Sequence, residues 1–364
     1  MILIVLLLSG SVWAQVVTAS FDRTVLSKNP AASTTRGIGQ VSVFADFKNS
    51  DSKINEKRSD GVDVPWKQNT EVSKTGIFFT GGGKAVIPEL YLSFDKGDRI
   101  LNLDLPNRTM NQEATNDVSF MNNLFNIGFR VSPTVGFGLK AYAPQYEYNE
   151  SYAFDYLDGR KSSQVGRIKT NFLGVGAGLT YLLGANWYFG GYFVLNKEDR
   201  DARYVFKDID GSIEIKDEVN QYTNSRFGLG LSYLNGRRGD GFRFEMAYNR
   251  MAHPDYLGVR DGEQFYSVME YSAKIVTLGV NLKLKKSIYY EETDLIDMVL
   301  SEAAITRGFI PQVGTFISFG SDKGHAFGVS VLYYRSKGYT NIFGEEQRSK
   351  TTHRGFSGNY AYLF

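Results

Sequence analysis

The side chains that could perform chemistry in this chain are few. It contains no Cys and only three His, namely His253, His325 and His353, each in or beside an expected connection. Hydrolysis requires a nucleophile or a positioned water, a base and a group that orients the base. No G-x-S-x-G sequence is present, and a chain without Cys has no thiolate metal site. We therefore expect a protein that is not an enzyme and that uses no metal and no cofactor.

Two short motifs that resemble ligand loops have simpler explanations. Residues 208–211 (Asp-Ile-Asp-Gly) are reminiscent of a calcium loop, but its twelfth position would be Asp217 rather than Glu. We expect a hairpin turn there. Residues 81–84 (Gly-Gly-Gly-Lys) do not form a phosphate loop, because Ala85 follows the lysine and no helix follows it. This segment is predicted to be a flexible kink in a strand.

The composition narrows the fold class. Of 364 residues, 38 are Gly and 14% are aromatic, with 26 Phe and 23 Tyr. The 41 basic and 39 acidic residues nearly cancel, so no overall field attracts nucleic acid. Past the first residues, no stretch approaches 18 apolar residues, which excludes a transmembrane helix. This composition is typical of a soluble β protein or of an outer-membrane β-barrel.

The first residues indicate export. Residues 2–8 are an unbroken apolar run, and Val12 and Ala14 occupy the −3 and −1 positions of a small-residue cleavage site before Gln15. The segment lacks the usual Lys or Arg before the apolar run, and a buried N-terminal strand is the alternative. We expect a signal peptide at residues 1–14, an N-terminal segment at 15–37, and a barrel at 38–364.

Most of the remaining chain alternates with a period of two, as β-strands do. In residues 171–182, one face carries apolar residues and the other carries Gly and Thr. In residues 242–250, one face is apolar and the other holds Arg243, Glu245, Ala247 and Asn249. A soluble sandwich would turn the apolar face inward, whereas a membrane barrel turns it toward lipid.

Connection lengths and the composition of the second face favour the barrel. The second face is rich in Gly, Tyr and Asn, which suits a lumen better than a solvent-exposed face. Short connections at 132–134, 184–186 and 235–241 alternate with long ones at 49–73, 106–119 and 252–262. Short periplasmic turns and long outer loops give this rhythm in outer-membrane barrels.

The C-terminus supports the same interpretation. The chain ends at Phe364, with Tyr362, Tyr360 and Phe356 on the same face of an alternating segment and Gly358 between them. A terminal aromatic residue on such a strand resembles the signal by which Gram-negative outer-membrane barrels are recognised by their assembly machinery. An ordinary edge strand that ends in Phe is the alternative. We expect localisation in a Gram-negative outer membrane, with the lipid bilayer and that machinery as partners.

The strand count contains a conflict. Thirteen candidate crossings lie near residues 38–48, 75–95, 99–105, 120–131, 135–150, 162–183, 187–207, 212–234, 242–251, 264–285, 309–320, 325–343 and 352–364. Bacterial barrels have even numbers of strands. Either residues 286–293 form a missed strand, which gives fourteen, or a helix crosses the lumen. An amphipathic pattern predicts a small helix near 291–304, and we favour fourteen strands with this helix in or near an outer loop, where it either caps the mouth or decorates the surface.

If the apolar faces meet lipid, a mixed set of side chains faces the lumen. The inward charged and tyrosine residues are Asp46, Glu89, Arg130, Lys140, Tyr188, Tyr192, Arg226, Arg243, Glu245, Glu270 and Lys274. Phe44, Phe172 and Phe316 have the same parity, and inward Phe favours an apolar path. Our ligand-binding candidates are Phe44, Phe172, Tyr188, Tyr192, Arg243, Glu245 and Phe316. The charges either select polar solutes or act as ion-paired struts.

The segment before the first strand contains Asn29-Pro30-Ala31, which is either a plug that folds back into the barrel or a periplasmic linker. Together with residues 86–94, where Pro88 precedes an alternating segment, and the hairpin 171–193, this box resembles the family of hydrophobic-compound transporters typified by FadL, OMPP1 and TodX. The resemblance implies a fourteen-stranded barrel, an N-terminal hatch and a lateral opening in the wall. The chain departs from the pattern in its short N-terminal segment and in its charged segment 48–74.

The leading functional hypothesis is passive transport of small hydrophobic or amphipathic ligands across the outer membrane. The first alternative is a porin-like channel for polar solutes, tuned by the lumen charges. The second is a scaffold barrel that binds a secretion or envelope complex. An apolar inward path favours the first, a continuous wet bore the second and a sealed lumen the third.

Overall fold

The computed structural model describes most of the chain as β-strands and short turns. The described residues are 29–31, 34, 39–57, 63–83, 85–103, 110–156, 159–184, 186–234, 240–252, 261–273, 276–286, 310–320, 324–342 and 345–364. The expected signal peptide and the expected helix near 291–304 lie outside these ranges. No helix in the described part of the chain is long and apolar enough to span a membrane.

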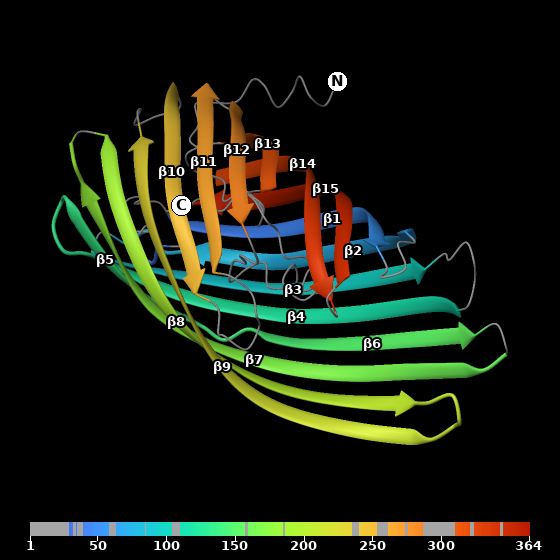
Figure 1. Ribbon diagram of the computed structural model, residues 1–364. Coiled ribbons are helices and arrows are strands. Elements are labelled where there is room, and N and C mark those ends of the chain that lie inside the picture. Colours follow the sequence, from blue (N-terminus) through green and yellow to red (C-terminus); the bar gives the residue numbers. More distant parts are fainter. Residues whose placement is uncertain are drawn as a thin grey trace.

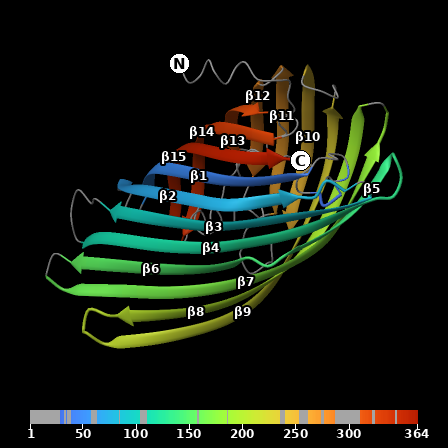
Figure 2. The same ribbon diagram turned by 180° about the vertical axis from the view of Figure 1, so that it is seen from behind.

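Fifteen strands form one antiparallel sheet (Figures 1 and 2). They are β1 (Gln40–Lys57), β2 (Asp63–Thr80), β3 (Val86–Leu103), β4 (Met110–Arg130), β5 (Val135–Tyr142), β6 (Gln145–Tyr156), β7 (Lys161–Leu182), β8 (Trp187–Lys207), β9 (Ile213–Leu234), β10 (Asp240–Ala252), β11 (Gly262–Ala273), β12 (Val276–Lys286), β13 (Ile310–Gly320), β14 (Gly324–Ile342) and β15 (Glu345–Leu363). Strands that follow one another in the sequence pair with each other, except β5 and β6, which each pair with β4 and β7, and β1 pairs with β15.

The sheet closes into a barrel of fourteen crossings. β5 and β6 both pair with β4 and β7 in one continuous register, so they form a single crossing interrupted at Ala143 and Pro144. Pro144 has no N–H to donate to the ladder, while the N–H of Ala143 is bound by the side chain of Asn123 at 2.9 Å. Fifteen strands therefore make fourteen crossings, as predicted. Closure satisfies the backbone groups that lipid could not.

The outer face of the barrel is apolar and the inner face is polar. Outward side chains on β8, such as Phe189, Phe193 and Leu195, are 43–49% exposed. Inward neighbours on the same strand, such as Tyr192 and Asn196, are buried. This is the arrangement of a transmembrane β-barrel, and it confirms the fold class predicted from the alternation.

The two ends of the barrel differ. One end, called the inner end, holds the short turn 132–134, the connection closed by the hydrogen bond from Leu183 to Trp187, and the paired residues Gly39 and Phe364. At the other, outer end, β7, β8 and β9 run far beyond β10 (Figure 1). β10 pairs only with residues 225–234 of β9, so residues 213–224 extend past it. The wall is therefore much taller on one side than on the other.

Three sequence predictions about connections are wrong. Residues 81–83, predicted as part of a kink within one strand, lie in the turn between β2 and β3, where the N–H of Gly81 donates to the carbonyl oxygen of Pro88 at 2.8 Å. Most of residues 49–73, expected as a long loop, belongs to β1 and β2, which pair from Gln40 opposite Thr80 to Lys57 opposite Asp63. Likewise β4 begins at Met110, within the expected loop 106–119. Both segments stand beyond the apolar belt, where neither face meets lipid, so no apolar alternation marks them as strands. In contrast, the predicted turn at 208–211 is confirmed, with Gly211 at a φ of 85°.

The missing fourteenth crossing is not where the sequence placed it. The candidate at 264–285 is two strands, β11 and β12, which pair from Glu263 opposite Lys286 to Ala273 opposite Val276. The connection between them has no Gly, Pro, Asn or Asp at residues 274–275 to mark a turn. The missed strand was proposed at residues 286–293, but Lys286 ends β12 and residues 287–293 lie outside the described residues. No strand there is needed for the count.

Candidate functional site

The Asn-Pro-Ala box lies inside the barrel. Asn29 and Ala31 are 2% and 0% exposed. The side-chain amide of Asn29 donates to the carbonyl oxygen of Leu179 at 2.8 Å, and its oxygen accepts from the N–H of Ala31 at 2.9 Å. Thr34 continues the contact, with its hydroxyl donating to the carbonyl of Ala31 at 2.6 Å. One asparagine thus fixes both the turn itself and its attachment to β7.

Glycines on the wall make room for this box. A Cβ atom added to Gly138 would lie 2.2 Å from the carbonyl carbon of Pro30, and one added to Gly178 would lie 2.1 Å from the side-chain oxygen of Asn29. At Gly136 the same atom would meet the hydroxyl of Thr34 at 2.0 Å. Gly136, Gly138 and Gly178 form the surface on which the box rests, called the glycine seat below. Only glycine lets the N-terminal segment approach the wall this closely.

A cavity of about 500 Å³ lies beside the box, at the inner end of the barrel. Its lining includes Thr34, Arg130 and Tyr188, with the turn at residues 132–134. The guanidinium of Arg130 donates to the carbonyl of Thr34, at 2.5 Å from Nη2 and 3.2 Å from Nε. Arg130, expected in the lumen, therefore lies at the inner mouth, where it holds the N-terminal segment from a second side.

Aromatic and aliphatic side chains gather in the lumen as two clusters. The mid-lumen cluster consists of Phe44, Phe78, Tyr91, Leu124, Tyr142, Tyr192, Val194, Ala247, Tyr266, Val268 and Phe316. The outer-lumen cluster consists of Val118, Phe120, Tyr146, Tyr148, Ile168, Phe172, Ala202 and Met251. The outer-lumen cluster lies nearer the outer end than the mid-lumen cluster. On β4, which begins at the outer end, its members Val118 and Phe120 precede Leu124 of the mid-lumen cluster.

Hydrogen bonds link two tyrosines of the mid-lumen cluster, Tyr142 and Tyr192, to the wall. The hydroxyl of Tyr142 donates to the side-chain oxygen of Asn196 and accepts from Arg226 at 2.8 Å. The hydroxyl of Tyr192 donates to Asn249 at 2.9 Å, and Asn249 in turn donates to Gln264 at 3.3 Å. The hydroxyls of these two tyrosines are therefore bonded to side chains that lie beyond the adjacent strand.

Buried charges in the lumen are paired. Arg243 contacts Glu270 at 3.1 Å and Glu245 at 3.2 Å, and these three side chains are 1–15% exposed. Lys74 lies 3.4 Å from Asp95, with both side chains at most 4% exposed. Breaking such a pair leaves an uncompensated buried charge, which costs about 3–5 kcal/mol. The pairs Arg243–Glu270 and Lys74–Asp95 link adjacent strands, while Arg243–Glu245 lies within β10.

The seven sequence candidates do not form one site. Phe44, Tyr192 and Phe316 belong to the mid-lumen cluster and Phe172 to the outer-lumen cluster. Tyr188 lines the inner cavity, while Arg243 and Glu245 form the ion pair on β10. Lys274 lies outside the described residues. The main additions are Tyr142, Tyr91 and Tyr266; their inward parity was visible in the sequence, but their closeness depends on strand register.

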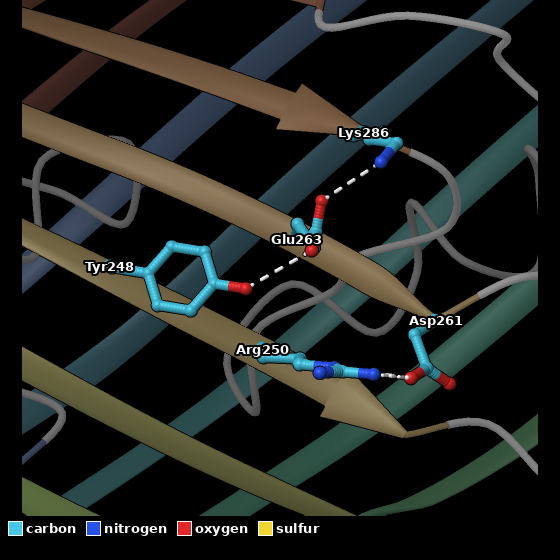
Figure 3. Close-up of polar contacts among 5 residues, drawn as sticks. All are labelled: Tyr248, Arg250, Asp261, Glu263 and Lys286. Carbon is cyan, nitrogen blue, oxygen red and sulfur yellow. Dashed lines mark hydrogen bonds and ion pairs between the residues drawn. The ribbon is translucent and has the colours of Figure 1, made fainter.

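A polar cluster marks the outer rim on the low side of the wall (Figure 3). Tyr248 donates to Glu263 at 3.1 Å, Lys286 donates to the same carboxylate at 3.0 Å, and Arg250 pairs with Asp261. These residues lie beyond the apolar belt, and the hydrogen bond from Lys286 lowers the pKa of Glu263 below its ordinary value of 4.5. The cluster ties the outer ends of β10, β11 and β12 together.

Comparison with known proteins identifies the fold. No protein-family model matches the chain, and no curated protein sequence matches it. Among solved structures, it is similar to the toluene transporter TodX of Pseudomonas putida, with a TM-score of 0.63 and 12% identity over 93% of this chain and 94% of that one. A FadL homologue of Pseudomonas aeruginosa gives a TM-score of 0.67 at 8% identity, over 97% and 99% of the two chains.

The toluene transporter TbuX of Ralstonia pickettii gives a TM-score of 0.52 at 11% identity, over 92% of both chains. At these identities the likeness concerns the fold. The protein is a transmembrane β-barrel with an N-terminal box seated in its lumen. Its particular fold is that of the FadL-type barrels, as the resemblance in the sequence implied.

Proposed function

We propose that this protein is an outer-membrane barrel that admits small hydrophobic or amphipathic compounds by passive diffusion. The observation that carries the proposal is the pair of aromatic clusters in the lumen, because a channel for polar solutes is expected to be lined by water-accessible polar groups. Two structural neighbours are described as toluene transporters, which supports an apolar ligand. No reaction is required, so the mechanism is diffusion past a removable obstruction.

The N-terminal segment is the proposed obstruction. Its box is held by Leu179 on β7, by the glycine seat and by Arg130 on β4. These are hydrogen bonds and close contacts rather than covalent links, so the segment can leave without breaking the barrel. A plug that blocks ions but yields to an arriving ligand would explain why the box is docked inside rather than left outside the barrel.

We test the plug by single-channel conductance in a planar bilayer. The full mature protein is expected to be closed to ions, and deletion of residues 15–37 is expected to produce a steady conductance. A large, steady conductance from the intact protein would promote the porin alternative. Unchanged behaviour after the deletion would show that this segment is not the plug.

Ligand transport needs a separate measurement. Cells that produce the protein in their outer membrane are expected to take up an apolar fluorescent probe, N-phenyl-1-naphthylamine, faster than control cells. A barrel that is closed to ions and also fails to admit the probe would favour the scaffold alternative. The combination of the two measurements therefore separates the three hypotheses.

Recognition by the barrel assembly machinery is proposed for the C-terminal strand. Phe364 is 50% exposed at the inner end, and its backbone pairs with Gly39 at 3.0–3.2 Å to complete the closure of β15 on β1. Replacing Phe364 with Ala is expected to reduce the amount of folded barrel in the membrane. The Phe356→Ala variant, on the same face of β15, is the matched control.

A further inference from the structure

Four aromatic rings of the mid-lumen cluster lie on glycines of the neighbouring strand. Phe44 is directly opposite Gly76, Tyr142 opposite Gly174, Tyr192 opposite Gly228 and Phe316 opposite Gly279. In each pair, a Cβ atom added to the glycine would overlap the ring, at 1.9–2.4 Å from a ring carbon. Four independent pairs on eight strands thus share one arrangement.

The glycines allow these rings to lie along the wall. A side chain on the opposite residue would occupy the space where the ring now rests, so the ring would have to turn toward the barrel axis. The two tyrosines show how far the rings reach, because each crosses its glycine strand and bonds an asparagine on the next strand, Asn196 or Asn249.

We propose that Gly76, Gly174, Gly228 and Gly279 determine the width of the lumen and therefore the size limit of the transported solute. The inference rests on the proposed function and adds to it the residues that select by size. The four rings belong to one contact cluster, so they act on the same part of the path. The hydroxyls of Tyr142 and Tyr192 are bonded to the wall, which holds both rings in place. Arg226 and Lys140 lie over these two rings, at 5.8 and 5.6 Å from the ring centroids, and Tyr91 stacks on Phe44.

Gly279 offers the sharpest test. The three atoms that its added Cβ would meet all belong to the ring of Phe316, at 2.0–2.7 Å. At Gly76 the same atom would also meet the backbone oxygen of Leu92 at 2.4 Å, so a substitution there would disturb the strand itself. Gly279→Ala should therefore move the ring and leave the backbone in place.

The experiment measures uptake of toluene, naphthalene and pyrene by cells that produce the full-length protein. Gly279→Ala is expected to reduce uptake of the larger probes relative to toluene by about tenfold, the discrimination that one methylene imposes in an apolar site. The double variant Gly279→Ala/Phe316→Ala removes the displaced ring. It is expected to restore the uptake of the larger probes relative to toluene. Gly358→Ala is the matched control, because a Cβ atom there meets nothing within 4 Å.

The outcomes distinguish failure of the size-limit proposal from failure of the proposed transport function. If the wild-type protein admits no probe, the proposed function fails and this inference fails with it. If the wild type admits the probes and Gly279→Ala changes none of their ratios, only the inference is overturned. Heat-modified migration in gels confirms that each variant folds. Should Gly279→Ala not fold, Phe316→Ala alone decides, since a wider lumen should favour pyrene and an unchanged ratio would contradict the proposal.

Discussion

Asn29 is the residue on which the seated N-terminal segment depends most. Its amide reaches the wall at Leu179 and its oxygen closes the turn at Ala31. Each hydrogen bond contributes about 1 kcal/mol, so losing both should lower the docked population by about tenfold or more. We predict that Asn29→Ala opens the barrel intermittently to ions, and single-channel recording measures the open fraction.

Asn69→Ala is the matched control for that variant. Asn69 is an outward residue of β2, and its amide donates to Asp51 at 3.0 Å in an exposed position. Removing it takes away one hydrogen bond without touching the lumen. If both variants leave the same closed barrel, Asn29 does not hold a plug.

At the scale of elements, the face of β5 and β7 that carries glycine should matter as much as the segment seated on it. We predict that Gly138→Ala displaces the box, because the new Cβ would lie 2.2–2.4 Å from backbone atoms of Pro30 and Ala31. The expected result is the same ionic leak as with Asn29→Ala, measured in the same bilayer. Gly184→Ala, where a Cβ meets nothing within 4 Å, should stay closed; a silent Gly138→Ala barrel would count against the seat.

The outer ends of β11 and β12 should be sensitive to pH. The pKa of Glu263 is lowered in the folded state by the hydrogen bond from Lys286. Its stabilising contribution is therefore complete above the ordinary value of 4.5 and is lost as the pH falls through the lower folded value. We predict that backbone hydrogen exchange at this rim quickens in acid for the wild type relative to Glu263→Gln measured at the same pH. A constant difference between the two proteins at every pH would contradict this.

At the scale of the whole molecule, the outer face should divide into a lipid belt and an extension in water. Leu229 and Val219 are both outward residues of β9, and they are 50% and 76% exposed. Arg near the middle of a bilayer costs about 2–4 kcal/mol, and much less at or beyond the interface. We predict that Leu229→Arg strongly destabilises the barrel and Val219→Arg does not.

Unfolding by urea in lipid vesicles measures both variants. The comparison is matched because both positions lie on the same strand and face, ten residues apart, which is about 33 Å along an extended chain. If both variants were equally destabilised, the lipid belt would extend further toward the outer end, as far as Val219, than the apolar pattern indicates. Two stable variants would show that this side of the barrel does not face lipid.

Strands in the belt could be predicted from the sequence, and strands beyond it could not. Within lipid, the two faces of a strand meet different media, so period-two alternation is obligatory and was visible in residues 171–182 and 242–250. The described parts of residues 49–73 lie beyond that belt, where neither face meets lipid, and their charges imitate a loop. The hairpin between β11 and β12 was missed because nothing in residues 274–275 marks a turn.

The sequence by itself determined the class of fold, the parity of the side chains in the strands of the apolar belt, and the Asn-Pro-Ala box. These follow from local chemistry, since alternation, composition and turn residues are properties of short segments. Only the tertiary structure decided that Gly138 and Gly178 seat that box, and that Phe316 lies on Gly279 and Tyr142 on Gly174. Such pairs depend on the register between strands, which hydrogen bonding around the closed barrel fixes and which no single segment encodes.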